Sequence, residues 1–255
     1  MQDTAADRFT ALSADERWLV DAGKVANAPG GVVLRTVDMT AAIACLDRLT
    51  RSGLPATPAH LVVRAAALVL TRNPELHATV CGYRTSTPGA VDVGLTADDL
   101  PGWRPVVLRG ADQHPLPALV RALNDAITAA PREERAAGHL MRLVPFGLLR
   151  RFVLRWLQRR FWFVRRLDGT FHVTYVPGAD VFVPLRFYTG SALGVGRVHE
   201  IATARRGRIE VRRVVSLALV VDHVALDGMR AATLLKEIAD ILEGGELGRE
   251  ALSVN

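Results

Sequence analysis

The stretch Leu219-Val220-Val221-Asp222-His223-Val224-Ala225-Leu226-Asp227-Gly228 joins the most apolar segment of the chain to its last amphipathic segment. Residues 214–221 are apolar and rich in β-branched side chains, which is typical of a strand buried on both faces. After Gly228, apolar residues recur at helical spacing as far as Gly244-Gly245, and this pattern predicts an amphipathic helix that ends there. We therefore interpret the stretch as a strand-to-helix junction.

His223 is the candidate functional residue of this junction. A histidine that leaves a strand just before a glycine can point into a cleft, where a neutral imidazole can take a proton from a thiol or a hydroxyl. Two other interpretations remain open on the residues alone. His223 is structural and Asp227 is the N-cap of the helix, or the pair binds a metal. The metal interpretation is weaker, because Gly228 and the preceding strand argue against a helical pair and no third ligand lies nearby.

Composition limits the classes of protein to which the chain can belong. Its 255 residues, 49% hydrophobic, suit one large domain or two small ones with a folded core. No stretch reaches the roughly 18 apolar residues of a membrane span, and residues 1–10 are polar and unlike a signal peptide, so we expect a cytoplasmic protein. Cys45 and Cys81 have no Cys-x-x-Cys spacing, so we expect two buried cysteines and neither a disulfide framework nor a zinc site.

Positive charge is concentrated in one segment. Residues 142–166 hold eight arginines and no acid, whereas the whole chain has a net charge of +6, so the remainder is near −2. The high isoelectric point therefore belongs to this segment, and it does not indicate a nucleic-acid-binding fold.

Local signals predict further elements along the chain. We expect a strand at residues 31–37, with an acid and a threonine capping a helix at 41–49. Thr57 and Pro58 predict the start of a second, almost fully apolar helix through residue 70. Strands are expected at 80–83, 90–96 and 105–109, and a helix at 116–127.

Several segments together resemble one known family. Asp222-His223, followed by Asp227-Gly228, resembles the active-site motif of the dihydrolipoyl acyltransferase catalytic domain of 2-oxoacid dehydrogenase complexes and of chloramphenicol acetyltransferase. Gly169-Thr170-Phe171-His172-Val173-Thr174 is similar to the family's Gly-Thr-Phe-Thr-Ile-Ser, and Ser191-Ala192-Leu193-Gly194-Val195-Gly196 to its Ala-Ile-Leu-Gly-Val-Gly. The segments occur in the family's order, over roughly residues 32–243.

The resemblance implies a fold and a mechanism. It implies an α/β two-layer sandwich with a mixed sheet, coenzyme A or acyl-CoA as co-substrate, no metal, and a homotrimer with active sites between subunits. His223 would be the general base, and Thr174, at the family's serine, would stabilise the oxyanion from the neighbouring chain. Asp227 would form a structural charge pair that holds the histidine loop, Gly228 would make its turn, and Gly169 would shape the site. The residues that contact coenzyme A are not assigned.

The chain also departs from the family. Tyr175 replaces an asparagine, and residues 129–167 form an insertion within a single domain spanning 1–255. Apolar residues at 149, 152, 153, 156 and 157 alternate with arginines, which predicts a basic amphipathic helix. It packs on the core, shapes the acceptor pocket, or meets an anionic membrane or an acidic carrier protein.

The acceptor is less well indicated than the reaction. Because the chain has no room for a lipoyl domain, we expect a stand-alone acyltransferase that transfers an acyl group, acetyl first among them, to a small-molecule hydroxyl or amine in secondary metabolism. The first alternative is a dihydrolipoyl acyltransferase served by a lipoyl domain on another chain. The second is a non-catalytic trimeric scaffold that retains the fold.

Overall fold

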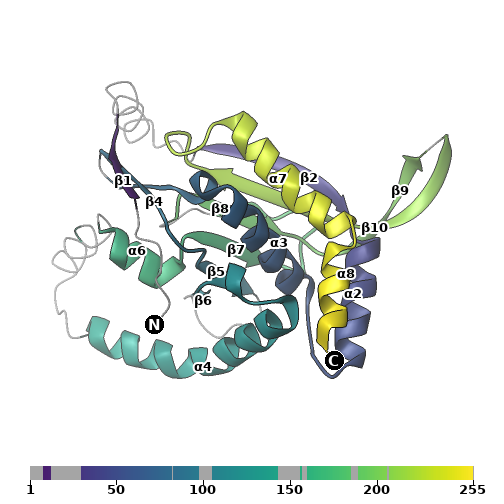
Figure 1. The fold of residues 1–255 in the computed structure, drawn as a ribbon, viewed down its shortest axis with the longest axis horizontal. Coiled ribbons are helices and arrows are strands. Elements are labelled where there is room, and N and C mark those ends of the chain that lie inside the picture. The colour runs from purple at the N-terminus through teal and green to yellow at the C-terminus, as the bar shows by residue number, and fades with distance from the viewer. Residues whose placement is uncertain are drawn as a thin grey trace.

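A computed structural model describes residues 8–12, 30–81, 83–97, 105–142, 156, 160–184, 189–205 and 207–254. The main sheet has seven strands in the order β2-β10-β8-β7-β5-β6, with β9 paired to β10 (Figure 1). Its strands are β2 (Gly31–Asp38), β5 (Val93–Ala97), β6 (Val106–Leu108), β7 (Phe171–Tyr175), β8 (Ser191–Val195), β9 (His199–Arg205) and β10 (Arg208–Val221). Because β7 is parallel to β5 and β8 whereas the other pairs are antiparallel, the sheet is mixed.

A second, three-stranded sheet has the order β1-β4-β3, formed by β1 (Arg8–Ala11), β4 (Arg84–Thr87) and β3 (Thr79–Cys81). The helices are α2 (Thr40–Arg51), α3 (Pro58–Arg72), α4 (Leu116–Arg142), α6 (Phe161–Asp168), α7 (Gly228–Glu243) and α8 (Glu246–Glu250), with 3₁₀ turns η1 (Pro74–His77), η2 (Ala111–Gln113) and η3 (Ala251–Val254). No helix in the described part of the chain is long and apolar enough to cross a membrane.

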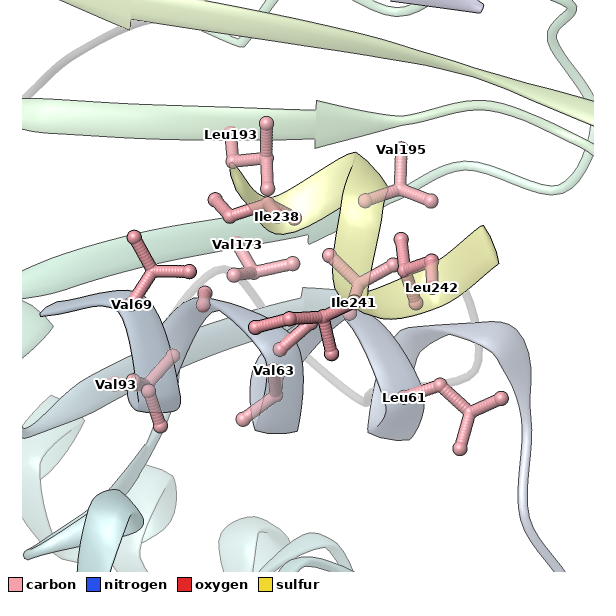
Figure 2. Packing of buried hydrophobic residues seen from close by; sticks show 14 of the residues in the cluster. Leu61, Val63, Val69, Val93, Val173, Leu193, Val195, Ile238, Ile241 and Leu242 are labelled. Carbon is pink, nitrogen blue, oxygen red and sulfur yellow. The ribbon is translucent and has the colours of Figure 1, made fainter. Parts of the chain in front are cut away.

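Alternate residues of the central strands build the core beneath the helices. Figure 2 shows side chains of α3 and α7 directed at Val173 of β7 and at Leu193 and Val195 of β8. Because side chains alternate along a strand, the residues between these positions lie on the opposite face. That opposite face carries His172 and Thr174.

Helix α3 begins as its sequence predicts. Thr57 is the N-cap, Pro58 is the first helical residue, and the imidazole of His60 accepts the backbone N–H of Thr57 at 3.0 Å. The helix is buried on nearly all sides, and its one buried cation is paired. The Arg64 guanidinium binds both carboxylate oxygens of Glu250 at 2.9 Å, so burial leaves no unbalanced charge there.

Gly194 of β8 and Gly196, just after it, allow another segment of the backbone to pack directly against the strand. A Cβ at Gly194 would lie 2.0 Å from the carbonyl oxygen of Phe182, and one at Gly196 would lie 2.3 Å from that of Asp180. The segment that follows β7 therefore crosses this face of the sheet in close contact, which only glycine permits.

β9 and the first half of β10 form a two-stranded arm that extends from the body of the molecule (Figure 1). Along it Ile209 is 81% exposed and Val211 is 67% exposed. The sheet face opposite the helices also exposes apolar residues at its β2 edge, where Val32 and Leu34 are 46% and 59% exposed.

Several predicted boundaries differ from those of the structure. The helix predicted at 116–127 continues as α4 to Arg142, because residues 132–142 are rich in strong helix formers. The strand predicted at 80–83 ends at Cys81 and turns at Tyr83 into β4. The N-cap of α2 is Met39, although the Asp38 carboxylate accepts the backbone N–H of Thr40 at 2.9 Å. The predicted basic helix, in residues 148–163, lies outside the described residues except for Trp156, Arg160 and residues 161–163, which begin α6. The exposed ring of Trp156 lies 4.7 Å from the Arg160 guanidinium.

Candidate active site

His223 lies on a tight turn that follows the last residue of β10. The backbone N–H of Asp222 binds the carbonyl oxygen of Gly190 at 2.9 Å, and the Asp222 carboxylate accepts the N–H of Val224 at 3.0 Å. The carbonyl oxygen of Asp222 then accepts from Ala225 and Leu226. The turn is thus fixed on both sides of His223, whose side chain is exposed and has no hydrogen bond to any residue that the structure describes.

Gly31 makes room for the His223 ring. It pairs with Val221 across the antiparallel β2–β10 ladder, and a Cβ on Gly31 would lie 2.9 Å from Nε2 of His223. The sequence analysis missed this role, since it interpreted Gly31 only as the start of a strand. This role could be predicted only from the fact that Gly31 pairs with the last residue of β10, and that fact requires knowledge of the register between the two strands.

Asp227 is the N-cap of α7. Its carboxylate accepts the backbone N–H of Arg230 at 2.8 Å, and the Arg230 side chain lies 4.0 Å from it. Gly228 is the first residue of α7, its φ lies outside the left-handed region, and a Cβ there would meet nothing within 4 Å. The turn of the histidine loop is therefore made by residues 222–226 and not by Gly228.

Thr174 lies on β7 beside two residues that the sequence analysis did not select. Its hydroxyl oxygen is 3.0 Å from Nε2 of His172, and Nδ1 of His172 contacts a carboxylate oxygen of Asp168. His172 pairs with Gly94 of β5 and Ala192 of β8, and a Cβ at Gly94 would lie 2.4 Å from the carbonyl oxygen of Asp168, so glycine there lets Asp168 come close to the strand. The i, i+2 spacing of His172 and Thr174 places them on one face of β7, and this spacing can be read from the sequence once the strand is known.

Gly169 bends the chain between α6 and β7. Its φ is +76°, and a Cβ there would lie 2.4 Å from the carbonyl oxygen of Asp92, which accepts the N–H groups of Thr170 and Phe171. Only glycine is unstrained in this conformation at such a close approach. Gly169 thereby places Asp168, the last residue of α6, next to His172.

The Asp92 carboxylate stabilises this bend through hydrogen bonds to the segments on either side of it. Burial would raise its pKa, but hydrogen bonds from Arg165 and Arg109 at 2.8 Å and from the Gly110 N–H at 3.0 Å outweigh burial and lower the pKa below its usual value. Asp92 is therefore held as a carboxylate that ties α6 to the loop after β6.

The register places His223 and Thr174 far apart within one chain. Thr174 pairs with Gly194, which pairs with Ala218, and His223 follows Ala218 by five residues. At about 3.3 Å per residue and about 4.8 Å between strands, Val221 at the end of β10 lies roughly 10 Å along the strands and 10 Å across them from Thr174, and His223 lies two residues farther on. The two side chains of one chain therefore cannot act on the same carbonyl carbon.

In the described part of the chain, no three histidine, cysteine, aspartate or glutamate side chains gather as metal ligands. Cys45 is buried, and burial raises the pKa of its thiol, which makes it a poor nucleophile. The groups available for chemistry are therefore the His223 imidazole, which can transfer a proton, and the Thr174 hydroxyl, which can donate a hydrogen bond.

Comparisons with known proteins identify the fold and a family match over part of the chain. The model of the 2-oxoacid dehydrogenases acyltransferase (catalytic domain) family matches residues 169–247, which contain Thr174 and His223. No curated protein matches the chain. A probable dihydrolipoamide acetyltransferase from Listeria monocytogenes 4b F2365 is similar in structure, with a TM-score of 0.68 and 17% identity over 94% of this chain and 96% of that one.

Two further structures have the same fold. The dihydrolipoamide acetyltransferase of Azotobacter vinelandii, in whose catalytic mechanism a serine, a histidine and an asparagine were investigated, has a TM-score of 0.67 and 19% identity over 89% of this chain and 88% of that one. A chloramphenicol acetyltransferase has a TM-score of 0.54 and 13% identity over 92% of this chain and all of that one. The predicted fold class is therefore confirmed. The chain has the fold of the dihydrolipoyl acyltransferase catalytic domains and chloramphenicol acetyltransferase, and residues 169–247 match the acyltransferase family itself.

Proposed function

We propose that the protein is a coenzyme A-dependent acyltransferase in which His223 is the general base and Thr174 is the oxyanion donor. The observation that carries the proposal is that the family match includes both residues, while the fold leaves His223 exposed on a fixed turn over Gly31. A ring nitrogen without a protein partner in the described structure is available to an acceptor's proton.

The reaction follows from these two groups. The acceptor's hydroxyl, amine or thiol attacks the carbonyl carbon of the acyl thioester and gives its proton to the His223 imidazole. The Thr174 hydroxyl donates a hydrogen bond to the oxygen on which negative charge develops. The carbon–sulfur bond then breaks, and the thiolate of coenzyme A takes the proton from the His223 imidazolium, which returns the imidazole to its neutral form. The acyl group passes directly to the acceptor, with no bond to the protein.

The active site is shared between two copies of the chain. His223 and Thr174 are too far apart in one chain to reach one carbonyl, so each must meet its counterpart from a neighbour. A closed ring of identical subunits provides every site with one residue of each kind, because its contacts are head-to-tail. The exposed Val32 and Leu34 on the sheet face opposite the helices support contact between copies there, and the resemblance makes the ring a trimer.

The preferred acceptor is a small-molecule hydroxyl or amine. Tyr175, directly after Thr174 on β7, introduces a large phenol where the family has an asparagine, and this change favours an altered acceptor. The similarity to dihydrolipoamide acetyltransferases favours a second candidate, a dihydrolipoyl group carried on another chain.

The test is mass-spectrometric detection of acyl transfer from acetyl-CoA to dihydrolipoamide and to a panel of small alcohols and amines. Replacing His223 by alanine should slow transfer by about 10²- to 10⁴-fold, the usual contribution of a general base. His223-dependent transfer to an alcohol or amine alone supports the stand-alone enzyme, whereas His223-dependent transfer to dihydrolipoamide supports the second candidate. Absence of turnover with every acceptor would contradict both and leave the scaffold interpretation.

A further inference from the structure

A carboxylate, an imidazole and a hydroxyl form a continuous chain on the face of β7. Asp168 contacts Nδ1 of His172, and Nε2 of His172 lies 3.0 Å from the Thr174 hydroxyl oxygen. The side chains of Asp168 and His172 are only 6% and 12% exposed. His172 stands where the family segment Gly-Thr-Phe-Thr-Ile-Ser has a threonine, so this row of hydrogen-bonded side chains is a property of the present sequence.

The buried Asp168 carboxylate needs a hydrogen-bond donor, and a positive partner stabilises it further. A carboxylate that is taken out of water is stabilised mainly by an opposite charge and by hydrogen bonds. Asp168 is also the last residue of α6, where the helix dipole is negative and disfavours an anion. His172 is the group in contact with the carboxylate, and its imidazolium form balances both unfavourable effects.

The protonation of His172 decides what the Thr174 hydroxyl can do. A hydroxyl has one proton to donate and two lone pairs that accept. If Nε2 carries no proton, the Thr174 hydroxyl donates its proton in a hydrogen bond to His172, and that proton is then not available to hydrogen-bond the oxyanion. If Nε2 carries a proton, it donates to the Thr174 oxygen, and the hydroxyl proton remains free for a substrate.

We propose that Asp168 and His172 are positioning residues for Thr174. Asp168 holds His172 with both ring nitrogens protonated, His172 donates to the Thr174 oxygen, and the Thr174 hydroxyl is thereby aimed at the oxyanion. The positive charge behind Thr174 also strengthens its hydroxyl as a donor. This inference rests on the proposed acyl transfer and specifies how one residue of that site is oriented.

Exchanging the imidazole for an amide tests the direction of the hydrogen bonds. In His172→Gln, the Asp168 carboxylate only accepts, so it takes the new NH₂ group and leaves the amide oxygen facing Thr174. We expect kcat to fall about 10- to 10²-fold, less than the ~10²- to 10³-fold typical of losing an oxyanion donor outright. KM for acetyl-CoA should stay unchanged. His199→Gln is the matched control, because the hydrogen bond of the His199 ring within the described part of the chain is to the backbone carbonyl oxygen of Arg197 at 3.2 Å.

Adding Asp168→Asn to His172→Gln supplies a donor at position 168 and lets the amide at 172 turn its NH₂ toward Thr174. The second substitution should therefore recover part of the lost kcat. A purely structural role predicts the opposite, since a second change at a buried contact would lower activity further or leave it unchanged, and either result would overturn the inference.

The proton on Nε2 can be observed directly. In ¹⁵N-histidine-labelled protein at pH 7, both ring nitrogens of His172, assigned by their loss in His172→Gln, should give the shifts of protonated nitrogens. An unprotonated Nε2 would overturn the proposal. The spectrum needs no turnover, so wild-type inactivity would refute the proposed function without deciding this inference.

Discussion

Gly31→Ala should impair catalysis while leaving the fold intact. The new Cβ would lie 2.9 Å from Nε2 and 3.0 Å from Cε1 of His223, whereas ordinary contacts begin at 3.4 Å. The ring must therefore retreat by about 0.5 Å, the difference between 3.4 Å and 2.9 Å. Because His223 is exposed, the side chain can move without disturbing the core.

The loss of rate follows from that displacement. A misplacement of about 1 Å can cost about 10²-fold in rate, so half of that distance should lower kcat/KM about tenfold. Stability should be unchanged or slightly higher, since alanine is favoured over glycine in a strand by about 0.5–1 kcal/mol.

The assay is release of the coenzyme A thiol, followed with a thiol-reactive dye, beside thermal unfolding of the same samples. Gly178→Ala is the matched control, because a Cβ at Gly178 meets nothing within 4 Å. Wild-type kcat/KM in a folded Gly31→Ala variant would refute the placement of the His223 ring as the catalytic base. A large drop in thermal stability would refute the claim that only the ring moves.

Two further substitutions test the bend that carries Asp168 and Thr174. Asp92→Asn should lower the free energy of unfolding by about 2–4 kcal/mol in urea titrations at pH 7, because it removes a buried charge that binds Arg109 and Arg165. Since the pKa of Asp92 is lowered in the folded protein, its contribution is present above the ordinary value of about 4 and is lost as pH falls below it. The variant should therefore lose less stability than the wild type between pH 4 and pH 2, and equal slopes would contradict the account. Gly169→Ala should cost roughly 2–5 kcal/mol, because it adds left-handed strain and a contact of 2.4 Å with the Asp92 carbonyl oxygen. Unchanged thermal stability of that variant would show that the bend tolerates a side chain.

The elements that the sequence predicts best are those with local signals. Thr57 and Pro58 identify the start of α3, and the run of apolar β-branched residues before Asp222 identifies the buried end of β10. Helix α7 begins at Gly228 and ends before Gly244, as the periodicity predicts. These features depend on residues a few positions apart, so one sequence is sufficient to find them.

The contacts that complete the site depend on distant residues or on a bend. Gly31 and His223 meet only because β2 pairs with β10 in a particular register. Asp168 reaches His172 only because Gly169 adopts a φ of +76° between a helix and a strand. Neither the register nor that φ can be obtained from periodicity, and this is why the sequence suggested Thr174 as a candidate but not His172 or Asp168.

The central claim is that one active site takes His223 from one chain and Thr174 from another. It is tested by co-expressing His223→Ala and Thr174→Ala chains with different tags and assaying the purified mixed assembly. Each variant alone should retain at most about 1% of activity, since each lacks one group of every site. In a trimeric ring every mixed assembly has one interface of three that receives both intact residues, so the purified mixture should recover about a third of wild-type activity. A mixed assembly no more active than either variant alone would contradict the shared site.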